Sequence, residues 1–314
     1  MMTPHDQIST AKVIASSILP NGVRVDTLQL RYWRPVHGEL MTHRDFSRNG
    51  ASGRAVPVQS VLVRDETYVP RFKHNQSGMS PAAYVSDEDQ KLAEAVWMEA
   101  VAACRKAAAV LSAKDGLNIH KQWPNRMIEW FGWIDVLVTS TRWSNWDALR
   151  MHPDAQDEIR YLAEAMWKAR QMTAPRVLKP GEWHLPYVTD EDRDEVAKLV
   201  RDGAYENSDR ICRVLGNLTK APAIVEQALS YETLILLAIS AARACRVSYA
   251  KMDGTPSTVE DDMRRFLLLA ESTPLHASPL EHQVRGLTPV DPAHWQGNLG
   301  GAVQFRKLIP NECL

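Results

Sequence analysis

The sequence predicts a helix-rich α+β fold, a single domain with an antiparallel or mixed sheet. Alanine-rich and amphipathic stretches recur along the chain, whereas strict apolar and polar alternation is confined to a few short segments. With 314 residues, of which 45% are hydrophobic, the chain can fill a sizeable core. No fixed-period repeat, low-complexity tract or clear linker divides it, so we predict one domain over residues 1–314.

The clearest strand signal is at residues 22–33, where apolar and polar side chains alternate. The phase slips between Val25 and Leu28, which suggests a β-bulge in this strand. Pro35 excludes a helix before it, and a short helix is predicted from His37 to near Asn49 and Gly50. Further strands are expected at 133–141 and 302–308.

Residues 55–85 contain several prolines and a polar tract, so we expect a long irregular connection there. The strongest helical signal then begins at Ser86, a typical N-cap residue followed by acidic residues that favour a helix N-terminus. Apolar side chains follow at helical spacing, namely Leu92, Val96, Ala103, Ala107 and Val110.

Four later segments also carry helical signals. Pro153 suits the first position of a helix whose buried stripe is Ile159, Leu162 and Met166. Helices are expected to begin near Thr189 and near Ser257, the second with a capping-box pattern. An alanine-rich helix is expected within 223–244.

Charge and cysteine content exclude several classes of protein. The 37 Lys and Arg residues balance 38 Asp and Glu residues, which argues against wrapping a nucleic-acid polymer and makes any anion site local. The four cysteines lie far apart without a C-x-x-C pair, which disfavours a zinc cage and a disulfide framework and fits a reducing compartment. Without a secretory pattern or a run of about 18 apolar residues, a cytoplasmic protein without membrane spans is expected.

Residues 41–57 gather arginines, hydroxyl side chains and glycines in one short stretch. A guanidinium binds two oxygens at once and glycine lets backbone N–H groups approach, so the stretch has the ingredients of phosphate recognition. A solvated basic turn is the competing interpretation. Arg126 and Arg150 lie among tryptophans and could clamp a planar ring or a carboxylate, or could extend past a tryptophan core.

Two other patterns do not support a site. His276, Glu281 and His282 lie close in sequence, but their spacing is not that of a zinc helix motif, and no metal is predicted. The glycines at 297–301 do not match a dinucleotide-binding fingerprint.

Residues 42–54, "THRDFSRNGASGR", resemble the signature of flavin-dependent thymidylate synthases: Arg-His-Arg, two residues, Ser, any residue, Asn-Glu, any residue, Ser, any residue, Arg. Thr42 and Gly50 stand where that family has its first Arg and its Glu. The matching positions are His43, Arg44, Ser47, Asn49, Ser52 and Arg54.

Four more segments are similar to segments of that family. "NRMIEW" and "NWDALRMHPDAQDEI" follow the signature in the family's order, within residues 22–166. "ACRVSY" at 244–249 and "HASPLEH" at 276–282 precede the signature in the usual family, but here they follow it, within residues 223–290. The chain therefore resembles a circular permutation of the family, which is tolerable because chain termini tend to lie at the surface and often close together.

The resemblance implies reductive methylation of dUMP to dTMP, with FAD as cofactor, methylenetetrahydrofolate as one-carbon donor and NADPH as reductant. It also implies a homotetramer whose active sites are shared between subunits. Arg150 stands at the position of the family's catalytic arginine, so the resemblance implies that it is the catalytic residue. Expected nucleotide contacts come from Glu39, Ser52, Gly53, Arg54, Arg126 and Arg150, and expected FAD contacts from His43, Arg44, Asn49, Asn145, Ser248 and His282.

The departures from the signature leave the substrate open. Glu39 stands where the family commonly has a glutamine that contacts the nucleotide, and Arg34, Arg48 or Lys121 could replace the missing arginine at Thr42. The same scaffold could therefore methylate or hydroxymethylate another pyrimidine nucleotide, such as dCMP or UMP, or convert dUMP to 5-hydroxymethyl-dUMP. The third alternative is a non-catalytic member of the family, or an unrelated nucleotide-binding or structural protein.

Overall fold

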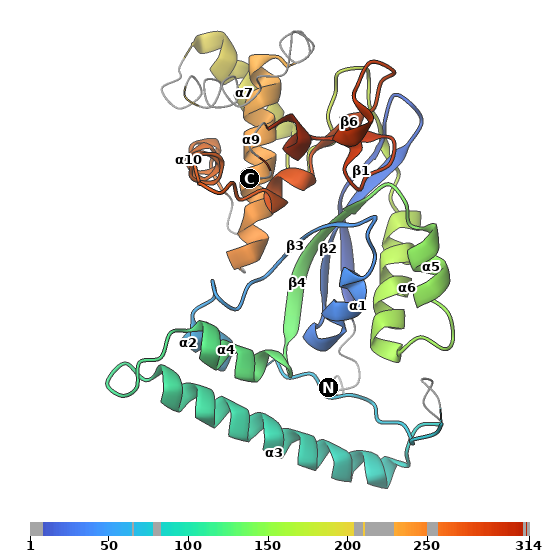
Figure 1. The fold of residues 1–314 in the computed structure, drawn as a ribbon, viewed down its shortest axis with the longest axis vertical. Helices are drawn as coiled ribbons and strands as arrows, with labels where there is room; N and C mark the ends of the chain where they lie inside the picture. Colours follow the sequence, from blue (N-terminus) through green and yellow to red (C-terminus); the bar gives the residue numbers. More distant parts are fainter. Residues whose placement is uncertain are drawn as a thin grey trace.

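A computed structural model describes residues 9–64, 66–77, 83–203, 210, 229–249, 257–309 and 312. Its centre is a five-stranded mixed sheet in the order β3-β4-β2-β1-β5, in which only β5 runs parallel to its neighbour (Figure 1). The strands are β1 (Thr10–Ile18), β2 (Arg24–Trp33), β3 (Ser47–Gly50), β4 (Trp133–Ser140) and β5 (Arg176–Val177). The predicted combination of helices with a mixed sheet is confirmed.

One face of the sheet packs on α5 (Ser144–Arg150) and α6 (Asp157–Gln171) (Figure 1). Leu28 and Leu30 of β2 enter this core together with the predicted α6 stripe of Ile159, Leu162 and Met166, all fully buried. The opposite face packs on α9 (Tyr231–Arg246), where Leu137 of β4 contacts Ala244 and Val247. The two faces of the sheet therefore belong to two different cores.

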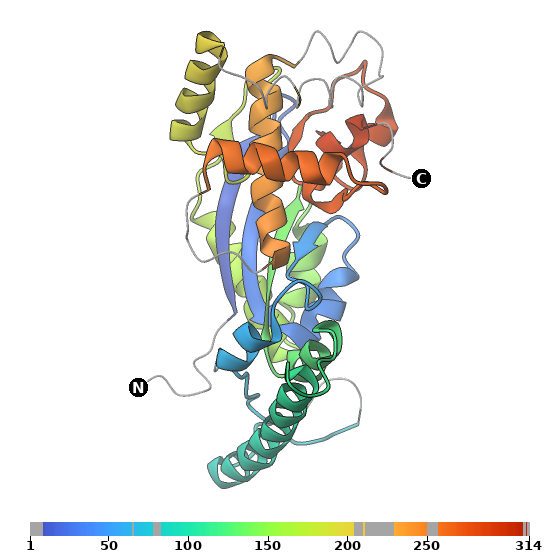
Figure 2. The same ribbon diagram turned by 90° about the vertical axis from the view of Figure 1, so that its left-hand side faces the viewer.

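A further core, separate from the contact at Leu137, lies at one end of the sheet around α9 (Figure 2). It includes α7 (Asp190–Asp202), α10 (Val259–Ala270) and Val303 of β7 (Ala302–Gln304), the strand that pairs with β6 (Val284–Gly286) in a two-stranded sheet. Short 3-10 helices complete the described chain: η2 (Arg34–Val36), η3 (Val247–Tyr249), η4 (Ser278–Glu281), η5 (Ala293–Gln296) and η6 (Phe305–Leu308).

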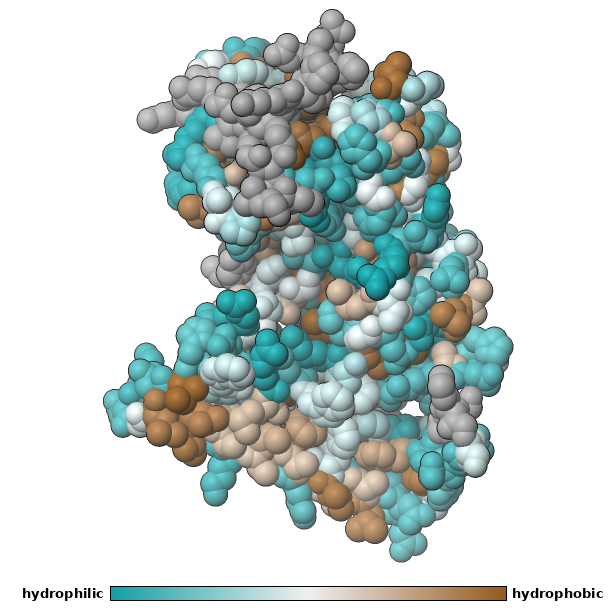
Figure 3. Space-filling model, viewed as in Figure 1, coloured by the Kyte–Doolittle hydropathy of each residue, from teal (hydrophilic) through white to brown (hydrophobic). Residues whose placement is uncertain are grey.

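The helix predicted from Ser86 is α3 (Asp87–Ser112), with the Ser86 hydroxyl accepting a hydrogen bond from the Asp89 N–H. It lies with α2 (Val58–Val63) and α4 (Gln122–Glu129) at the other end of the sheet (Figure 1). The apolar stripe noted in the sequence points to solvent: Leu92, Val96 and Val110 are 67%, 60% and 56% exposed. Figure 3 shows apolar side chains along this lower part of the molecule.

The predicted helix from His37 to Gly50 is wrong beyond its first turns. Helix α1 covers only His37–Met41, and residues 47–50 form strand β3. The Arg48 guanidinium donates to the carbonyl oxygens of Met41 and His43 and so satisfies the end of α1. Pairing with β4 then gives the following backbone groups partners that a longer helix would have supplied.

The strand predicted at 22–33 is confirmed as β2, but the bulge lies in its partner. The register of β1 shifts between Val13 and Ala15, opposite Leu28 and Thr27, where the sequence shows its change of phase. Strand β1 itself was not predicted. Strand β4 matches the strand expected at 133–141.

Several boundaries differ by a few residues. Helix α6 starts at Asp157, because residues 151–156 form a turn rather than a helix opened by Pro153. The cap of α10 is Thr258, one residue after Ser257, whereas Thr189 caps α7 with a capping box as expected. The irregular connection at 55–85 contains α2, and the strand expected at 302–308 ends at Gln304. Residues 223–228 of the predicted alanine-rich helix lie outside the described residues, and α9 covers the prediction from Tyr231 onward.

Candidate active site

Strand β3, at the edge of the sheet, fixes the start of the loop that follows it. We call this loop, residues 51–57, the signature loop. It pairs antiparallel with β4, so that Ser47 lies opposite Thr139 and Asn49 opposite Leu137. Because side chains alternate along a strand, Ser47 and Asn49 share the face of Leu137, which packs on α9. The signature loop therefore begins against the C-terminal end of α9.

Asn49 is a buried hydrogen-bonding centre between segments that are far apart in sequence. Its Nδ2 donates to the carbonyl oxygen of Ala244 at 2.7 Å, and its Oδ1 accepts from Ser248 Oγ at 2.8 Å. Ser278 Oγ approaches the same Oδ1 at 3.5 Å. The Ser52 N–H also donates to the Ser248 carbonyl oxygen at 3.0 Å. The structure thus brings together the expected site residues Asn49, Ser52 and Ser248.

Two residues of η4 near this centre, Ser278 and Glu281, were not among the expected site residues. Glu281 forms an ion pair with Arg306. Burial raises the pKa of the Glu281 carboxyl, although Arg306 and Arg48 act in the opposite direction. The segment 276–282 was recognised as a motif, but only its last histidine was taken as a site residue. The contact with Asn49 now adds Ser278 to the candidate site.

His282 lies in the interior, as part of a chain of hydrogen bonds that crosses the sheet. Its Nδ1 is 2.8 Å from Thr139 Oγ1, which is 2.6 Å from Thr27 Oγ1. Thr27 in turn contacts His184 Nε2 at 2.8 Å, and His184 Nδ1 contacts Ser17 Oγ at 2.9 Å. Burial lowers the pKa of both histidines to about 3, so both rings are neutral at neutral pH. The expected contact of His282 with FAD stays a prediction.

The expected catalytic residue, Arg150, is held by three side chains of the α1 region. Its Nη1 donates to Glu39 Oε2 at 2.7 Å, its Nε donates to His43 Nε2 at 3.0 Å, and its Nη2 lies 3.4 Å from Thr42 Oγ1. Four residues that the resemblance placed at or beside the nucleotide and flavin sites therefore meet in one cluster. We call Glu39, Thr42, His43 and Arg150 the Arg150 cluster.

His43 enters this cluster as a neutral hydrogen-bond acceptor. Because Arg150 Nε donates to His43 Nε2, the ring proton belongs on Nδ1. Burial lowers the pKa of His43, and the positive charges of Arg150 and Arg48 lower it further. The ring also packs edge-on against Trp146, with centroids 4.7 Å apart. The neutral imidazole therefore orients the guanidinium by accepting its hydrogen bond, and it does not repel the positive charge.

Four other expected site residues face solvent: Arg44, Arg54, Arg126 and Asn145. Asn145 lies on α5, the helix that ends at Arg150, and Arg126 lies on α4. None of the four lines the cavity beside the signature loop that is described next. Their expected contacts with nucleotide or flavin stay predictions.

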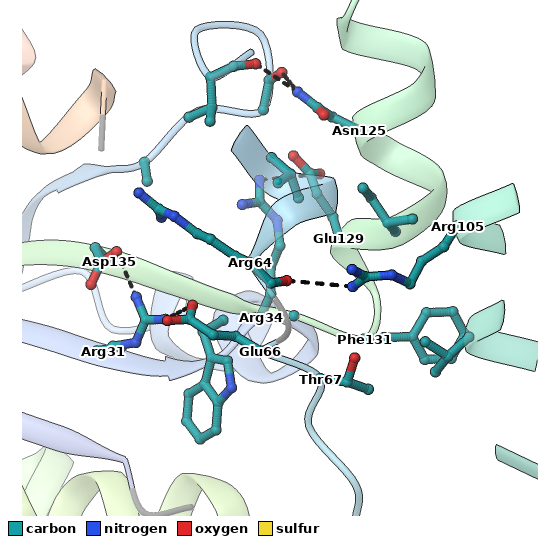
Figure 4. Close-up of a pocket in the computed structure, with 18 of the residues that line it drawn as sticks. Arg31, Arg34, Arg64, Glu66, Thr67, Arg105, Asn125, Glu129, Phe131 and Asp135 are labelled. Carbon is teal, nitrogen blue, oxygen red and sulfur yellow. Dashed lines mark hydrogen bonds and ion pairs between the residues drawn. The ribbon is translucent and has the colours of Figure 1, made fainter. Parts of the chain in front are cut away.

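A cavity of about 100 Å³ opens between the signature loop, the sheet and helices α2, α3 and α4 (Figure 4). Ser52 and Gly53 line it on the loop side. We call it the arginine cavity, because its charged lining comprises four arginines and three carboxylates: Arg31, Arg34, Arg64, Arg105, Glu66, Glu129 and Asp135.

Three of the four arginines have partners. Arg31 binds Glu66 and lies 3.0 Å from Asp135, and Arg34 lies 3.2 Å from Glu129. Arg105 donates to backbone carbonyl oxygens of α2 and its end. Burial lowers the pKa of Arg34, so an additional anion would be favourable beside it.

Arg64 differs from the other arginines of the cavity. Among the described residues its side chain makes no hydrogen bond or ion pair, and it is exposed. Figure 4 shows this side chain running into the cavity on the side of Asp135. Its guanidinium fork is therefore available to a ligand.

Packing holds the signature loop against α4. The buried Asn125 Nδ2 donates to the carbonyl oxygens of Gly53 and Val56, at 2.7 and 2.9 Å. A Cβ atom added at Gly53 would overlap the carboxylate of Glu129. Glycine at this position therefore permits the close approach of loop and helix that shapes the cavity.

The structure distinguishes the three side chains that could replace the arginine missing at Thr42. Arg48 donates to backbone carbonyls at the end of α1, and Lys121 Nζ donates to the Ala55 carbonyl oxygen at 2.9 Å. Arg34 lines the arginine cavity beside Ser52 and Gly53. Among these three, Arg34 therefore has the position best suited to bind an anion at the loop.

The described residues contain no group of three or more His, Cys, Asp or Glu side chains arranged to hold a metal ion. His282 and Glu281 have separate partners, Thr139 and Arg306. Within the same residues, no helix is both long enough and apolar enough to span a bilayer.

No protein-family model matches the chain, and no curated protein matches it. Among solved structures, the UMP/dUMP methylase PolB from Streptomyces cacaoi bound with 5-Br UMP is 17% identical, over 52% of this chain and 88% of that chain, with a TM-score of 0.43. The same enzyme bound with 5-Br dUMP gives 16% identity, coverages of 52% and 89%, and a TM-score of 0.41. Thymidylate synthase X from Helicobacter pylori with FAD and dUMP is 16% identical, over 46% of this chain and 67% of that chain, with a TM-score of 0.32. Because all three TM-scores are below 0.5, no function is inferred from these likenesses. The functional argument rests on the residues of this chain.

Proposed function

We propose that this protein catalyses FAD-dependent reductive methylation of dUMP to dTMP, with methylenetetrahydrofolate as one-carbon donor and NADPH as reductant. The observation that carries the proposal is the hydrogen-bonding centre at Asn49. There the signature loop meets the segments 244–249 and 276–282, which the sequence places far from it. Motif segments in a permuted order that still meet in space support one circularly permuted domain.

The arginine cavity is the proposed site for the nucleotide phosphate. The Ser52 hydroxyl and the glycine at position 53 lie at its wall, and Arg34 and Arg64 supply positive charge. A guanidinium can bind two phosphate oxygens, each through a charge-assisted hydrogen bond. Arg54 and Arg126 lie outside this wall and would contact the nucleotide only from the solvent side.

The residues around Asn49 suit a flavin. The exposed Arg44 offers a charge for the pyrophosphate, and Asn49, Ser248 and Ser278 form a group of amide and hydroxyl atoms of the kind that holds a polar ring edge. Asn145 would contribute from α5. Bound FAD would supply the hydride for reduction at the pyrimidine, while the chain binds and orients the reactants.

Arg150 is the proposed catalytic residue. Methylation at C5 requires negative charge to spread onto the oxygen at C4, and a fixed guanidinium beside that oxygen stabilises it. His43 and Glu39 hold the Arg150 side chain, which is 17% exposed, so it loses little freedom when substrate binds.

The Arg150 cluster and the arginine cavity have no residue in common. We therefore propose that each active site combines the Arg150 cluster of one subunit with the arginine cavity of another, in a homotetramer. The exposed apolar face of α3 supports association, because monomeric proteins rarely expose a large contiguous apolar surface.

A second candidate is methylation or hydroxymethylation of another pyrimidine nucleotide. The hydroxyl of Thr42 favours it, because it presents a different hydrogen-bonding group from the arginine of the family signature.

Anaerobic turnover tests the proposal directly. The purified protein is mixed with FAD, NADPH, methylenetetrahydrofolate and dUMP, and the nucleotide product is identified by mass. A gain of one methyl group that disappears in Arg150→Ala and partly returns in Arg150→Lys is the expected result. Reduced flavin with unchanged dUMP, but with a mass gain on UMP or dCMP, would favour the second candidate. Absence of both flavin and nucleotide binding would refute an enzymatic role.

A further inference from the structure

Glu39 and Arg150 form an ion pair that is partly open to solvent. Their side chains are 36% and 17% exposed, and Glu39 Oε2 lies 2.7 Å from Arg150 Nη1. Both oxygens of a carboxylate in an ion pair accept hydrogen bonds and donate none. No described residue donates a hydrogen bond to Oε1 of Glu39. One acceptor is therefore free for a ligand.

Arg150 offers free donors directly beside this acceptor. A guanidinium has five N–H groups, of which Nε is used by His43 and one on Nη1 is used by Glu39. The contact from Nη2 to Thr42 is long, at 3.4 Å. A ligand therefore meets an acceptor on Glu39 next to donors on Arg150, and the ion pair fixes the positions of these groups relative to each other.

We propose that Glu39 selects the base of the nucleotide by accepting a hydrogen bond from N3–H of uracil, while Arg150 donates to the adjacent O4. The inference rests on the proposed function and assigns the residue that determines its base specificity. Uracil matches the pair because its N3–H lies next to a carbonyl oxygen. In this register the guanidinium lies on the O4 side, next to C5, where positive charge stabilises the negative charge that develops.

Cytosine does not match in the same register. Its N3 carries a lone pair in place of a hydrogen, which would face the carboxylate of Glu39 without a proton between them. Shifting the ring by one position would place the amino group on Glu39 and N3 on Arg150, but the carboxylate would then lie beside C5, where it opposes the reaction. A site built to bond an N–H group rejects analogues without it, because the bound base covers the site's own polar group and leaves it unpaired.

Glutamine at position 39 would remove this selection. Its amide oxygen can still accept from Arg150, and its NH₂ group can donate to N3 of cytosine. The variant Glu39→Gln is therefore expected to weaken discrimination between the two bases while keeping a partner for Arg150. Glu195→Gln is the matched control, because Glu195 is an exposed glutamate on α7, outside both the Arg150 cluster and α3.

The test is competitive binding of dUMP and dCMP to the FAD-loaded protein. The wild type is expected to bind dUMP more tightly, and Glu39→Gln to reduce the ratio of the two dissociation constants by at least about tenfold. Glu195→Gln is expected to keep the wild-type ratio. Unfolding curves of both variants show whether either has lost stability.

The outcomes separate this inference from the function on which it rests. If the wild type prefers dUMP but Glu39→Gln keeps the same ratio, Glu39 does not read the base, and the proposed function stands. A wild-type preference for dCMP overturns the inference and favours the second candidate function. If neither nucleotide binds, the proposed function and the inference are both wrong.

Discussion

The hydroxyl of Ser248 donates a hydrogen bond to the side-chain oxygen of Asn49 at 2.8 Å, although 199 residues separate the two in sequence. The same asparagine also binds the backbone of Ala244. A single buried side chain thus fastens the edge strand of the sheet to the C-terminal end of α9. Its loss would affect both the fold and the candidate site.

The variant Asn49→Ala is expected to lower the free energy of unfolding by about 1 to 3 kcal/mol. It removes the donor to the Ala244 carbonyl and the acceptor for Ser248 in a buried place, and unpaired buried polar groups carry a cost of this size. Urea unfolding followed by tryptophan fluorescence measures the change. Asn75→Ala is the control, since Asn75 is exposed. Equal stability of the two variants would contradict the role assigned to Asn49.

Local signals predicted well where the chain interacts with itself at short range. Ser86 and Thr189 cap α3 and α7 through their own next residues, so the sequence around each start was sufficient. The Arg150 cluster joins residues 107 to 111 positions apart. The resemblance named Glu39, His43 and Arg150, but no local pattern could predict their mutual contacts or the ion pair.

The variant Gly53→Ala is expected to weaken dUMP binding by about tenfold or more. The added Cβ would displace the Glu129 carboxylate and disturb its ion pair with Arg34 at the proposed phosphate site. Comparing dissociation constants for dUMP and deoxyuridine isolates the phosphate contribution, which should fall. Gly116→Ala is the control, because its Cβ would meet atoms no closer than 3.4 Å and Gly116 does not line the cavity. An unchanged difference between dUMP and deoxyuridine would place the phosphate elsewhere.

Stability is expected to decrease as the pH falls below about 6.5. His184 and His282 have pKa values near 3 when folded, so the unfolded chain binds their protons first. Each histidine then lowers the free energy of unfolding by about 1.4 kcal/mol per pH unit, until the pH nears 3. Above pH 6.5 both histidines are neutral in the folded and the unfolded chain, so the penalty for burying them no longer changes with pH.

The slope of this pH dependence can be assigned by mutation. Urea unfolding between pH 7 and 4 is compared for the wild type and His282→Gln. In the variant the free energy of unfolding should change less steeply with pH, by about 1.4 kcal/mol per pH unit. His74→Gln, which changes an exposed histidine, should keep the wild-type slope. If His282→Gln has the same slope as the wild type, His282 is not the group that binds a proton on unfolding.

Strand β1 shows why part of the sheet was not predicted. Its register shifts between Val13 and Ala15, which interrupts the alternation that marks a strand, and its buried Ser16 bonds Asp26 of β2 instead of packing as an apolar residue. The stripe of α3 shows the opposite case. Its spacing correctly indicated a helix, but in the chain as described the stripe faces solvent, so spacing alone did not show what covers it.

The exposed stripe of α3 leads to the prediction that Val96→Asp reduces the size of the assembly. Val96 is 60% exposed between Leu92 and Val110, and a charge buried at an interface between subunits would remain unpaired. Sedimentation velocity is expected to give a tetramer for the wild type and a smaller species for the variant. Val290→Asp is the control, because Val290 is 71% exposed and lies outside α3.

Turnover of the same variants links assembly to the active site. If the Arg150 cluster and the arginine cavity of different subunits form one site, Val96→Asp should lose turnover together with the tetramer, while its monomer keeps the wild-type helical content. Mixing Arg150→Ala with Gly53→Ala subunits should then restore part of the activity, because some sites would receive both intact halves. Full activity of a monomeric Val96→Asp variant would show that a single chain contains the whole site.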